Sequence, residues 1–119
     1  MESVFLEDFK DISDIKRNFE LKDKDLKGVK ILLAYYAVEC YEGDAFVLFE
    51  KRGKLYEVNG SHCSCYGLEG QWEPELTSRE AICHRMSEGT LGLDYRKNDT
   101  FRKKLIEVLF IGSEGKTIV

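Results

Sequence analysis

The stretch KILLAYYAV, Lys30–Val38, decides the fold that this sequence predicts. After the lysine, every residue is apolar or aromatic, and such residues are enriched in β-strands. A strand with no polar side chain on either face is typical of a position at the centre of a sheet or under cover on both faces. We therefore expect a buried strand around which the other elements are arranged.

Two further strands are expected directly after it. Ala45–Glu50 and Leu55–Val58 are rich in β-branched, aromatic and other apolar residues. The turn-like sequences YEGD (Tyr41–Asp44) and KRGK (Lys51–Lys54) separate the three segments. Short turns of this kind join neighbouring antiparallel strands, so the sequence predicts a three-stranded antiparallel meander.

The N-terminal region has a different period. Between Val4 and Phe19, apolar residues recur at intervals of three and four, at Phe5, Phe9, Ile12, Ile15 and Phe19. This spacing places them on one face of an amphipathic helix. We therefore expect an N-terminal helix that covers the sheet.

Two shorter helices are expected towards the C-terminus. The sequence TSRE, Thr77–Glu80, has the form of a capping box and predicts a helix that ends near Ser87. The last helix is predicted for Phe101–Phe110, where Phe101, Leu105, Val108 and Leu109 share a face. The predicted fold class is α+β, with an N-terminal helix, a three-stranded antiparallel meander, a long functional loop and two C-terminal helices in a single globular domain, 1–119.

The long loop is the predicted functional region. Its sequence, NGSHCSCYGLEGQWEPEL at Asn59–Leu76, contains three glycines, two cysteines, a histidine, the only Trp and the only Pro of the chain. It has neither a helical nor a strand period, and structureless connections of this length are uncommon in compact domains unless they bind or catalyse.

Zinc is the first ligand to consider, because the chain offers His62, Cys63, Cys65, Cys83 and His84. Structural zinc sites usually present ligand pairs two to four residues apart, and neither Cys63-x-Cys65 nor the adjacent Cys83-His84 has that spacing. Adjacent side chains on a helix also diverge by about 100°. The glycines match neither a P-loop nor a dinucleotide fingerprint. The sequence therefore favours no metal and no cofactor.

A cysteine nucleophile is the second candidate, since a thiolate beside an imidazole is a recurring catalytic pair. His62 is poorly placed to be the base for Cys63, because neighbours in an extended chain point to opposite sides. His84 would have to be brought in by folding. The alternative function is thus a small cysteine-thiol or zinc-dependent enzyme centred on Cys63, Cys65 and His84, against the simpler interpretation of ordinary thiols.

A binding surface without catalysis is the third interpretation. Trp and Tyr side chains often anchor interfaces or stack on ring ligands, and Glu69, Glu73 and Glu75 would make the rim acidic. Trp72 can equally fold back and cap the sheet, since large aromatic side chains are usually well buried. The predicted binding residues are His62, Cys63, Cys65, Tyr66, Glu69, Gln71, Trp72, Glu73, His84 and Arg85.

Charge and hydropathy restrict the partners. A formal net charge of −4 argues against general nucleic-acid binding, which needs a basic face. The longest apolar run, Ile31–Val38, is too short to cross a bilayer, so no membrane is expected as a partner. Acidic residues in MESVFLEDFKDISDIKR, where a signal peptide is basic, favour a cytoplasmic location and reduced cysteines. Self-association into a homo-oligomer is left open.

The string GSHCSCYGLEGQWEPE, Gly60–Glu75, followed by a helix containing His84-Arg85, resembles a family of small uncharacterised phage, prophage and bacterial proteins. The resemblance begins in LFEKRGKLYEVNGSH, Leu48–His62, and extends to about Gly92. It implies a setting and no catalytic role: a small acidic protein of a mobile element that blocks a host defence system or another host enzyme. The preferred function is a phage-type inhibitor that binds a host protein, or a sequesterer of a small nucleotide ligand used in defence, acting through the 59–76 loop in the host cytoplasm.

Overall fold

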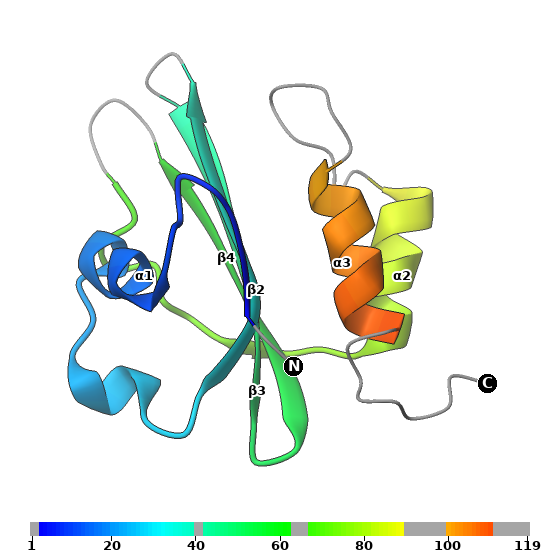
Figure 1. Cartoon of the computed structure of the whole chain (residues 1–119), viewed down its shortest axis with the longest axis horizontal. Helices are drawn as coiled ribbons and strands as arrows, with labels where there is room; N and C mark the ends of the chain where they lie inside the picture. Colours follow the sequence, from blue (N-terminus) through cyan, green and yellow to red (C-terminus); the bar gives the residue numbers. More distant parts are fainter. Residues whose placement is uncertain (1–2, 40–41, 63–66, 90–99, 111–119) are drawn as a thin grey trace.

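A computed structural model describes residues 3–39, 42–62, 67–89 and 100–110 of the chain. The strands are β1 (Val4–Glu7), β2 (Lys30–Glu39), β3 (Glu42–Lys51), β4 (Lys54–His62) and β5 (Glu75–Leu76). The α-helices are α1 (Ile12–Phe19), α2 (Arg79–Glu88) and α3 (Thr100–Phe110), and a short 3₁₀ helix, η1, spans Asp23–Leu26. Figure 1 shows these elements in sequence colours.

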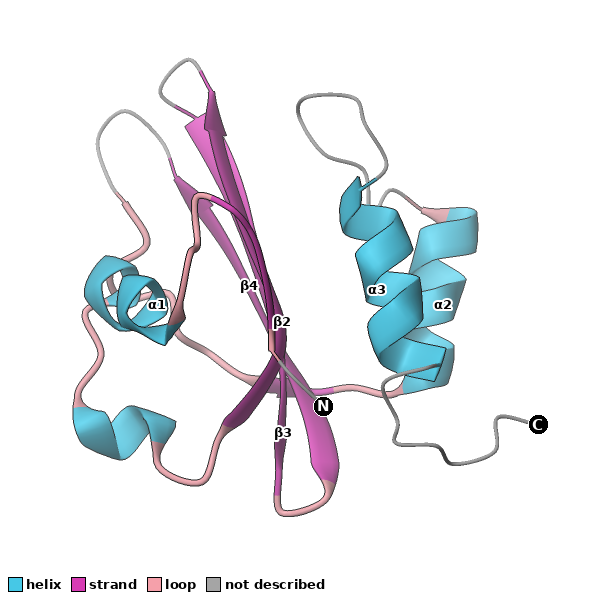
Figure 2. Ribbon diagram, viewed as in Figure 1, coloured by secondary structure: helices cyan, strands magenta, loops and turns pink. Residues whose placement is uncertain are grey.

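The strands form one mixed sheet in the order β1-β2-β3-β4-β5. β1 pairs with β2 in parallel, and all the other pairs are antiparallel. Figure 2 shows α1 and η1 on one side of this sheet and α2 and α3 on the other. The sheet is therefore the middle layer of three.

Each face of the sheet has its own hydrophobic core, and the strands supply both cores by alternation. In β2, Ala34 and Tyr36 face the α1 side, whereas Tyr35 and Ala37 face α2 and α3. The expected central strand is confirmed, because β2 lies between β1 and β3 and is buried on both faces. A β-bulge between Ile31 and Leu33 shifts the register at its start.

The predicted fold class is wrong in two respects. The sheet has five strands and not three, and the chain begins with a strand before the first helix. Val4–Glu7 pairs with Leu33–Tyr36 instead of forming the first half of a helix. The apolar period was misleading because Phe5 and Phe9 pack into the same core as Ile15 and Phe19, although their backbone is not helical.

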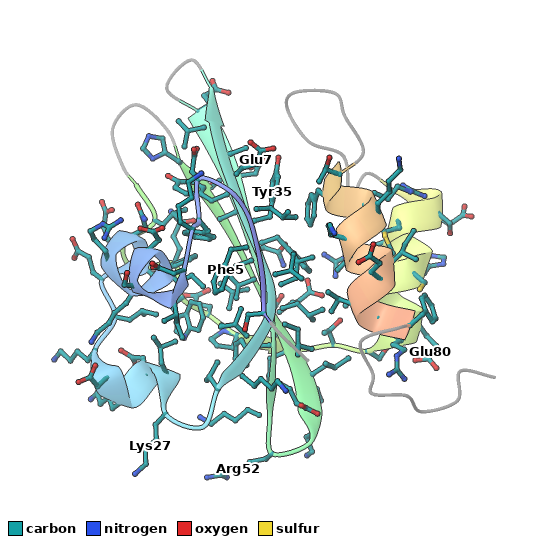
Figure 3. The ribbon with its side chains drawn as sticks, viewed as in Figure 1. Phe5, Glu7, Lys27, Tyr35, Arg52 and Glu80 are labelled. Carbon is teal, nitrogen blue, oxygen red and sulfur yellow. The ribbon has the colours of Figure 1, made fainter. Side chains whose placement is uncertain are left out.

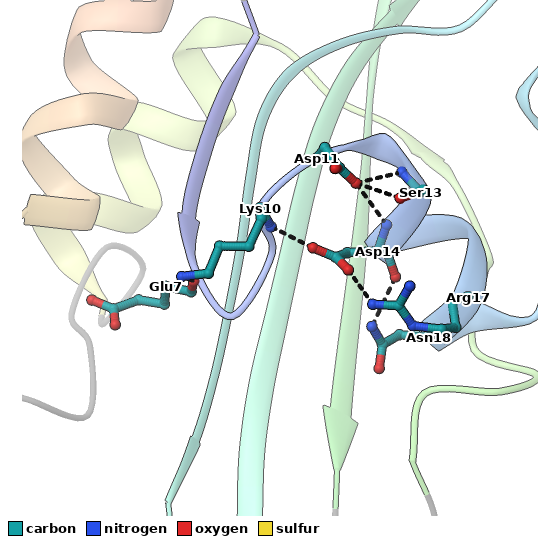
Figure 4. Close-up of polar contacts among 7 residues, drawn as sticks. All are labelled: Glu7, Lys10, Asp11, Ser13, Asp14, Arg17 and Asn18. Atoms are coloured by element: carbon teal, nitrogen blue, oxygen red, sulfur yellow. Dashed lines mark hydrogen bonds and ion pairs between the residues drawn. The ribbon is translucent and has the colours of Figure 1, made fainter.

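Helix α1 begins at Ile12 because Asp11 caps it (Figure 4). The Asp11 carboxylate accepts hydrogen bonds from Ser13 N at 2.9 Å and Asp14 N at 3.2 Å. These amides lie in the first turn, where they have no partner within the helix. The Asp14 carboxylate in turn accepts from Lys10 N at 2.7 Å and from the Arg17 guanidinium. This network fixes the turn between β1 and α1.

The C-terminal helices lie close to the expected positions. Helix α3 buries Phe101, Leu105, Val108 and Leu109, as the sequence predicts. Helix α2 begins one residue later than expected, because Ser78 and not Thr77 is the N-cap and accepts from Ala81 N at 3.1 Å. Within the described residues, no helix has the length and apolar character needed to cross a membrane.

Candidate functional site

The segment predicted as a long loop is partly ordered by the sheet. Strand β4 continues to His62, and Glu75–Leu76 returns as β5 beside Tyr56 and Glu57. Between them, the Gln71 side chain acts as a clamp. Its amide accepts from Ser61 N at 2.8 Å and donates to Ser61 O and to Gly67 O, each at 2.7 Å. Gln71, expected to bind a partner, therefore holds the segment against the edge of β4.

Gly60 allows this close approach. A Cβ at this position would lie 3.1 Å from Leu68 Cδ2 and 3.4 Å from both Gln71 Oε1 and Phe19 Cε1. Leu68 is buried in the core on the α1 side. A side chain at residue 60 would therefore push both the clamp and Leu68 away from the sheet.

Trp72 turns back onto the sheet. Its ring is nearly parallel to that of Phe49, with centroids 5.7 Å apart and an interplanar angle of 10°, and it meets the Phe19 ring edge-on at 5.2 Å. Trp72 is half-buried against the core on the α1 side. Of the two interpretations that the sequence leaves open, capping of the sheet is the one that this packing supports, and part of the ring stays accessible.

The accessible part of Trp72 lines a groove of about 270 Å³. The groove lies between the β3–β4 hairpin, the η1–β2 connection and the segment that follows Gln71. Its lining residues are Asp25, Val29, Phe49, Lys51, Arg52, Tyr56, Trp72 and Pro74. This volume is just below the range of about 300 to 1,000 Å³ that is usual for small-molecule sites.

The floor of the groove is aromatic. The Phe49 and Tyr56 rings lie 5.4 Å apart at an interplanar angle of 21°, and Trp72 is nearly parallel to Phe49 on the same face. Phe49 is only 2% exposed, whereas Tyr56 and Trp72 are half-buried. The three rings therefore form one ladder whose outer members are open to a ligand.

The charged side chains of the groove are mainly basic. Lys51 and Arg52 line it, and neither forms an ion pair with any residue in the described ranges. Among the described lining residues, Asp25 is the single acidic one, and its Oδ2 accepts from Lys22 N at 2.8 Å. The acidic residues expected to form the rim, Glu69, Glu73 and Glu75, are exposed and do not line the groove.

Arg52 is presented by a tight hairpin turn. Both Arg52 (φ 55°) and Gly53 (φ 77°) have left-handed backbone conformations, as a two-residue type I′ turn requires. Asn or Gly is preferred at the first of these positions, and other residues are strained there. Figure 3 shows Arg52 projecting from the same end of the molecule as Lys27.

His62 belongs to a different cluster at the far end of β4. Its Nδ1 lies 3.2 Å from the hydroxyl of Tyr36, a buried tyrosine. Burial raises the pKa of Tyr36 above its usual value, and the charges of Asp8 and Glu69 raise it further. The Tyr36 hydroxyl therefore keeps its proton and can take part in this hydrogen bond as donor or acceptor.

Arg85, also expected to bind a partner, has a structural role on the other face of the sheet. Its Nη1 donates to Glu57 Oε1 at 2.6 Å and Oε2 at 2.7 Å, and Asn59 Nδ2 donates to Oε2 at 2.7 Å. Glu57 is only 3% exposed. Burial alone would raise its pKa, but hydrogen bonds from Arg85, Asn59 and Thr77 and the charge of Arg85 outweigh that effect and lower it. The pair connects α2 to β4.

The cysteine and zinc hypotheses fall mostly outside the described residues. Cys63, Cys65 and Tyr66 are not described, so their roles stay predictions. His84 is exposed on α2, and Cys83 is a half-buried free thiol against the core of the α2 and α3 side. His62, the described residue next to Cys63, contacts Tyr36, which belongs to the core on the α1 side. Among the residues with defined positions, no three His, Cys, Asp or Glu side chains are grouped to hold a metal ion.

Phe49, Lys51, Arg52 and Tyr56 are among the groove residues that the sequence interpretation missed. They were assigned to strands or to the KRGK turn and were given no binding role. One signal was present, since three of the four residues in that turn are basic in a chain of net charge −4. A turn needs only Gly, Asn or Asp, so a cluster of cations there calls for another explanation.

Comparison with known proteins gives no relative, since no family model, curated sequence or solved structure matches this chain.

Proposed function

We propose that this protein is a non-enzymatic binding protein of the phage-inhibitor type, which occupies a host protein or sequesters a small ligand in the bacterial cytoplasm. The groove beside Trp72 is its recognition surface. The observation that carries this proposal is the open aromatic ladder of the groove next to two cations without ion-pair partners among the described residues. Large aromatic side chains and Arg are the residues that contribute most to recognition.

The arrangement of the groove supports binding by a preformed surface. Phe49 and Tyr56 come from paired positions of adjacent strands, and Trp72 is fixed on Phe49 by stacking. The clamp of Gln71 on Ser61 holds the chain next to Trp72. A surface ordered before binding loses less conformational entropy when a partner binds.

Affinity capture from a bacterial lysate tests the proposal, with bound proteins and small molecules identified by mass spectrometry. The test variant is Lys51→Glu/Arg52→Glu, which reverses the charge of the groove. The matched control is Lys54→Glu, an exposed position in the same hairpin that does not line the groove. We expect a partner that wild type and the control retain and the double variant loses, and that is recovered chemically unchanged. A partner retained equally by all three proteins, or a ligand recovered in an altered form, would contradict the proposal.

A further inference from the structure

We infer that the groove binds a nucleoside phosphate as a free small molecule, with the base on the aromatic ladder and the phosphate at Lys51 and Arg52. This inference rests on the proposed function and names its ligand. Its starting point is that the groove combines three chemical features within about 270 Å³: flat aromatic surface, cations and one carboxylate.

The aromatic ladder selects a planar group. Tyr56, Phe49 and Trp72 are close to parallel, with interplanar angles of 21° and 10° between neighbours. Aliphatic side chains also cover such a surface, but a planar ring covers it with the offset stacking that aromatic rings favour. Any of the nucleobases can stack on an aromatic side chain, because every base has a π-face.

The cations select a negative group beside the ring. Lys51 ends β3 and Arg52 begins the turn, and both line the groove together with the ladder residue Phe49. Arg and Lys both bind phosphate, Arg through its fork of N–H donors and Lys as a compact positive charge. The strained position of Arg52, where Asn or Gly would be easier to accommodate, is consistent with retention of a guanidinium for binding.

Asp25, which lies in η1, supplies the third feature. Lys22 N holds one of its carboxylate oxygens, and the other is not bonded to any described residue in the hydrogen bonds of this structure. A carboxylate accepts hydrogen bonds and repels a second anion. It therefore suits ribose hydroxyls or an exocyclic amine and not the phosphate.

Size and net charge favour a free nucleotide over a nucleic acid chain. The groove is smaller than the usual range for drug-sized ligands, which suits one base with its sugar. The net charge of −4 repels a long polyanion, whereas a single nucleotide needs only the local cations of the hairpin.

Trp72 provides the measurement, since it is the only Trp of the chain and lines the groove. Its fluorescence is followed during titration with AMP, GMP, CMP and UMP, with adenosine and inorganic phosphate as separate ligands, and calorimetry checks the constants. We expect saturable quenching by at least one nucleotide, with an affinity at least about tenfold higher than for adenosine or phosphate alone. Added salt should weaken the nucleotide complex, since the phosphate contacts are partly exposed.

The charge variants distinguish nucleotide binding in the groove from general electrostatic attraction of the nucleotide to the protein surface. Lys51→Glu/Arg52→Glu should weaken nucleotide binding by about tenfold or more, whereas Lys54→Glu should stay within about twofold of wild type. Circular dichroism and thermal unfolding confirm that each variant is folded. Binding of no nucleotide above adenosine and phosphate, or equal losses in both variants, would overturn the inference. If nucleotides fail but groove-dependent capture of a protein persists, the ligand assignment is wrong and the binding function stands.

Discussion

Arg52 has a backbone conformation that its side chain does not favour. Its left-handed φ of 55° is needed for the two-residue turn with Gly53. For most L-residues this conformation costs about 1 to 2 kcal/mol, and Asn tolerates it better. The position therefore gives up stability, which is a common feature of residues kept for binding.

The prediction at Arg52 concerns stability and binding together. Arg52→Asn should raise the free energy of unfolding by about 0.5 to 1 kcal/mol and weaken ligand binding. Urea unfolding and the Trp72 titration measure the two effects. Lys54→Asn is the control, because Lys54 is the first residue of β4 and has no positive φ. Equal stability changes in the two variants would show that strain at Arg52 is not the cause.

Trp72 is part of the fold as well as the groove. The sequence left open whether Trp72 anchors an interface or caps the sheet, and its ring packs on Phe19 and Phe49. Truncation of a fully buried Trp costs about 3 to 5 kcal/mol, and a half-buried ring contributes less.

We therefore expect Trp72→Ala to lower the free energy of unfolding by about 2 kcal/mol, measured in urea by circular dichroism. Trp72→Phe should recover part of the loss, because a smaller ring can still stack on Phe49. The neighbouring exposed Glu73→Ala should change stability by less than about 0.5 kcal/mol. An unchanged midpoint in Trp72→Ala would restore the interpretation of Trp72 as a residue used for recognition alone.

At the scale of the elements, α2 is connected to the sheet by the pair between Glu57 and Arg85. Glu57 is 3% exposed, and the two Arg85 contacts are 2.6 and 2.7 Å long. A carboxylate in this position is stable only while it is charged and fully hydrogen-bonded. The packing of α2 on the sheet therefore becomes less stable when Glu57 is protonated.

The sign of this effect follows from the lowered pKa of Glu57 in the folded protein. The stabilisation is fully present above the unfolded-state pKa, near 4.5, and is lost as the pH falls through the lower folded-state pKa. We expect urea midpoints of wild type and Glu57→Gln to differ most at neutral pH and to converge on acidification below about 4.5. The exposed Glu75→Gln should follow the wild-type profile. A constant difference between wild type and Glu57→Gln across this range would contradict the role of Glu57.

The N-terminal third shows how an element can be misjudged from its period. Phe5, Phe9, Ile15 and Phe19 all contribute to one core, so their spacing fits a helix, but a strand and a turn place the first two there. Asp11 was the local signal for the true helix start. Pairing of Val4–Glu7 with β2 supplies its backbone hydrogen bonds, and no local pattern records that pairing.

For the whole molecule, the sheet separates the face covered by α2 and α3 from the face that carries α1 and the groove. Leu105 is fully buried between α3 and the sheet, whereas the groove lies on the α1 side. A substitution in one core should therefore affect global stability and leave the other face in place as long as the protein is folded.

Leu105→Ala tests this separation. Creation of a cavity should lower the free energy of unfolding by about 2 to 4 kcal/mol. Nucleotide affinity, measured well below the unfolding temperature, should stay within about twofold of wild type, because distant sites behave independently. The same two measurements on Ile15→Val, which changes the core on the α1 and groove side, are compared with those on Leu105→Ala. A loss of affinity in Leu105→Ala as large as in the groove variant would show that the two faces are coupled.

The sequence alone determined the features that depend on residues close to one another along the chain. The apolar run of β2 requires cover on both faces, the KRGK turn joins β3 to β4, and the period of α3 selects its buried residues. The sequence also predicted that residues 59–76 carry the function. This stays a prediction, although Trp72 and Pro74 of that segment line the groove.

Only the tertiary structure decided the pairing of β1, the clamp of Gln71, the inward turn of Trp72 and the link between Arg85 and Glu57. Each of these joins segments that are separated along the chain. Their free energy comes from burial and hydrogen bonding between those segments, which composition, period and spacing do not encode.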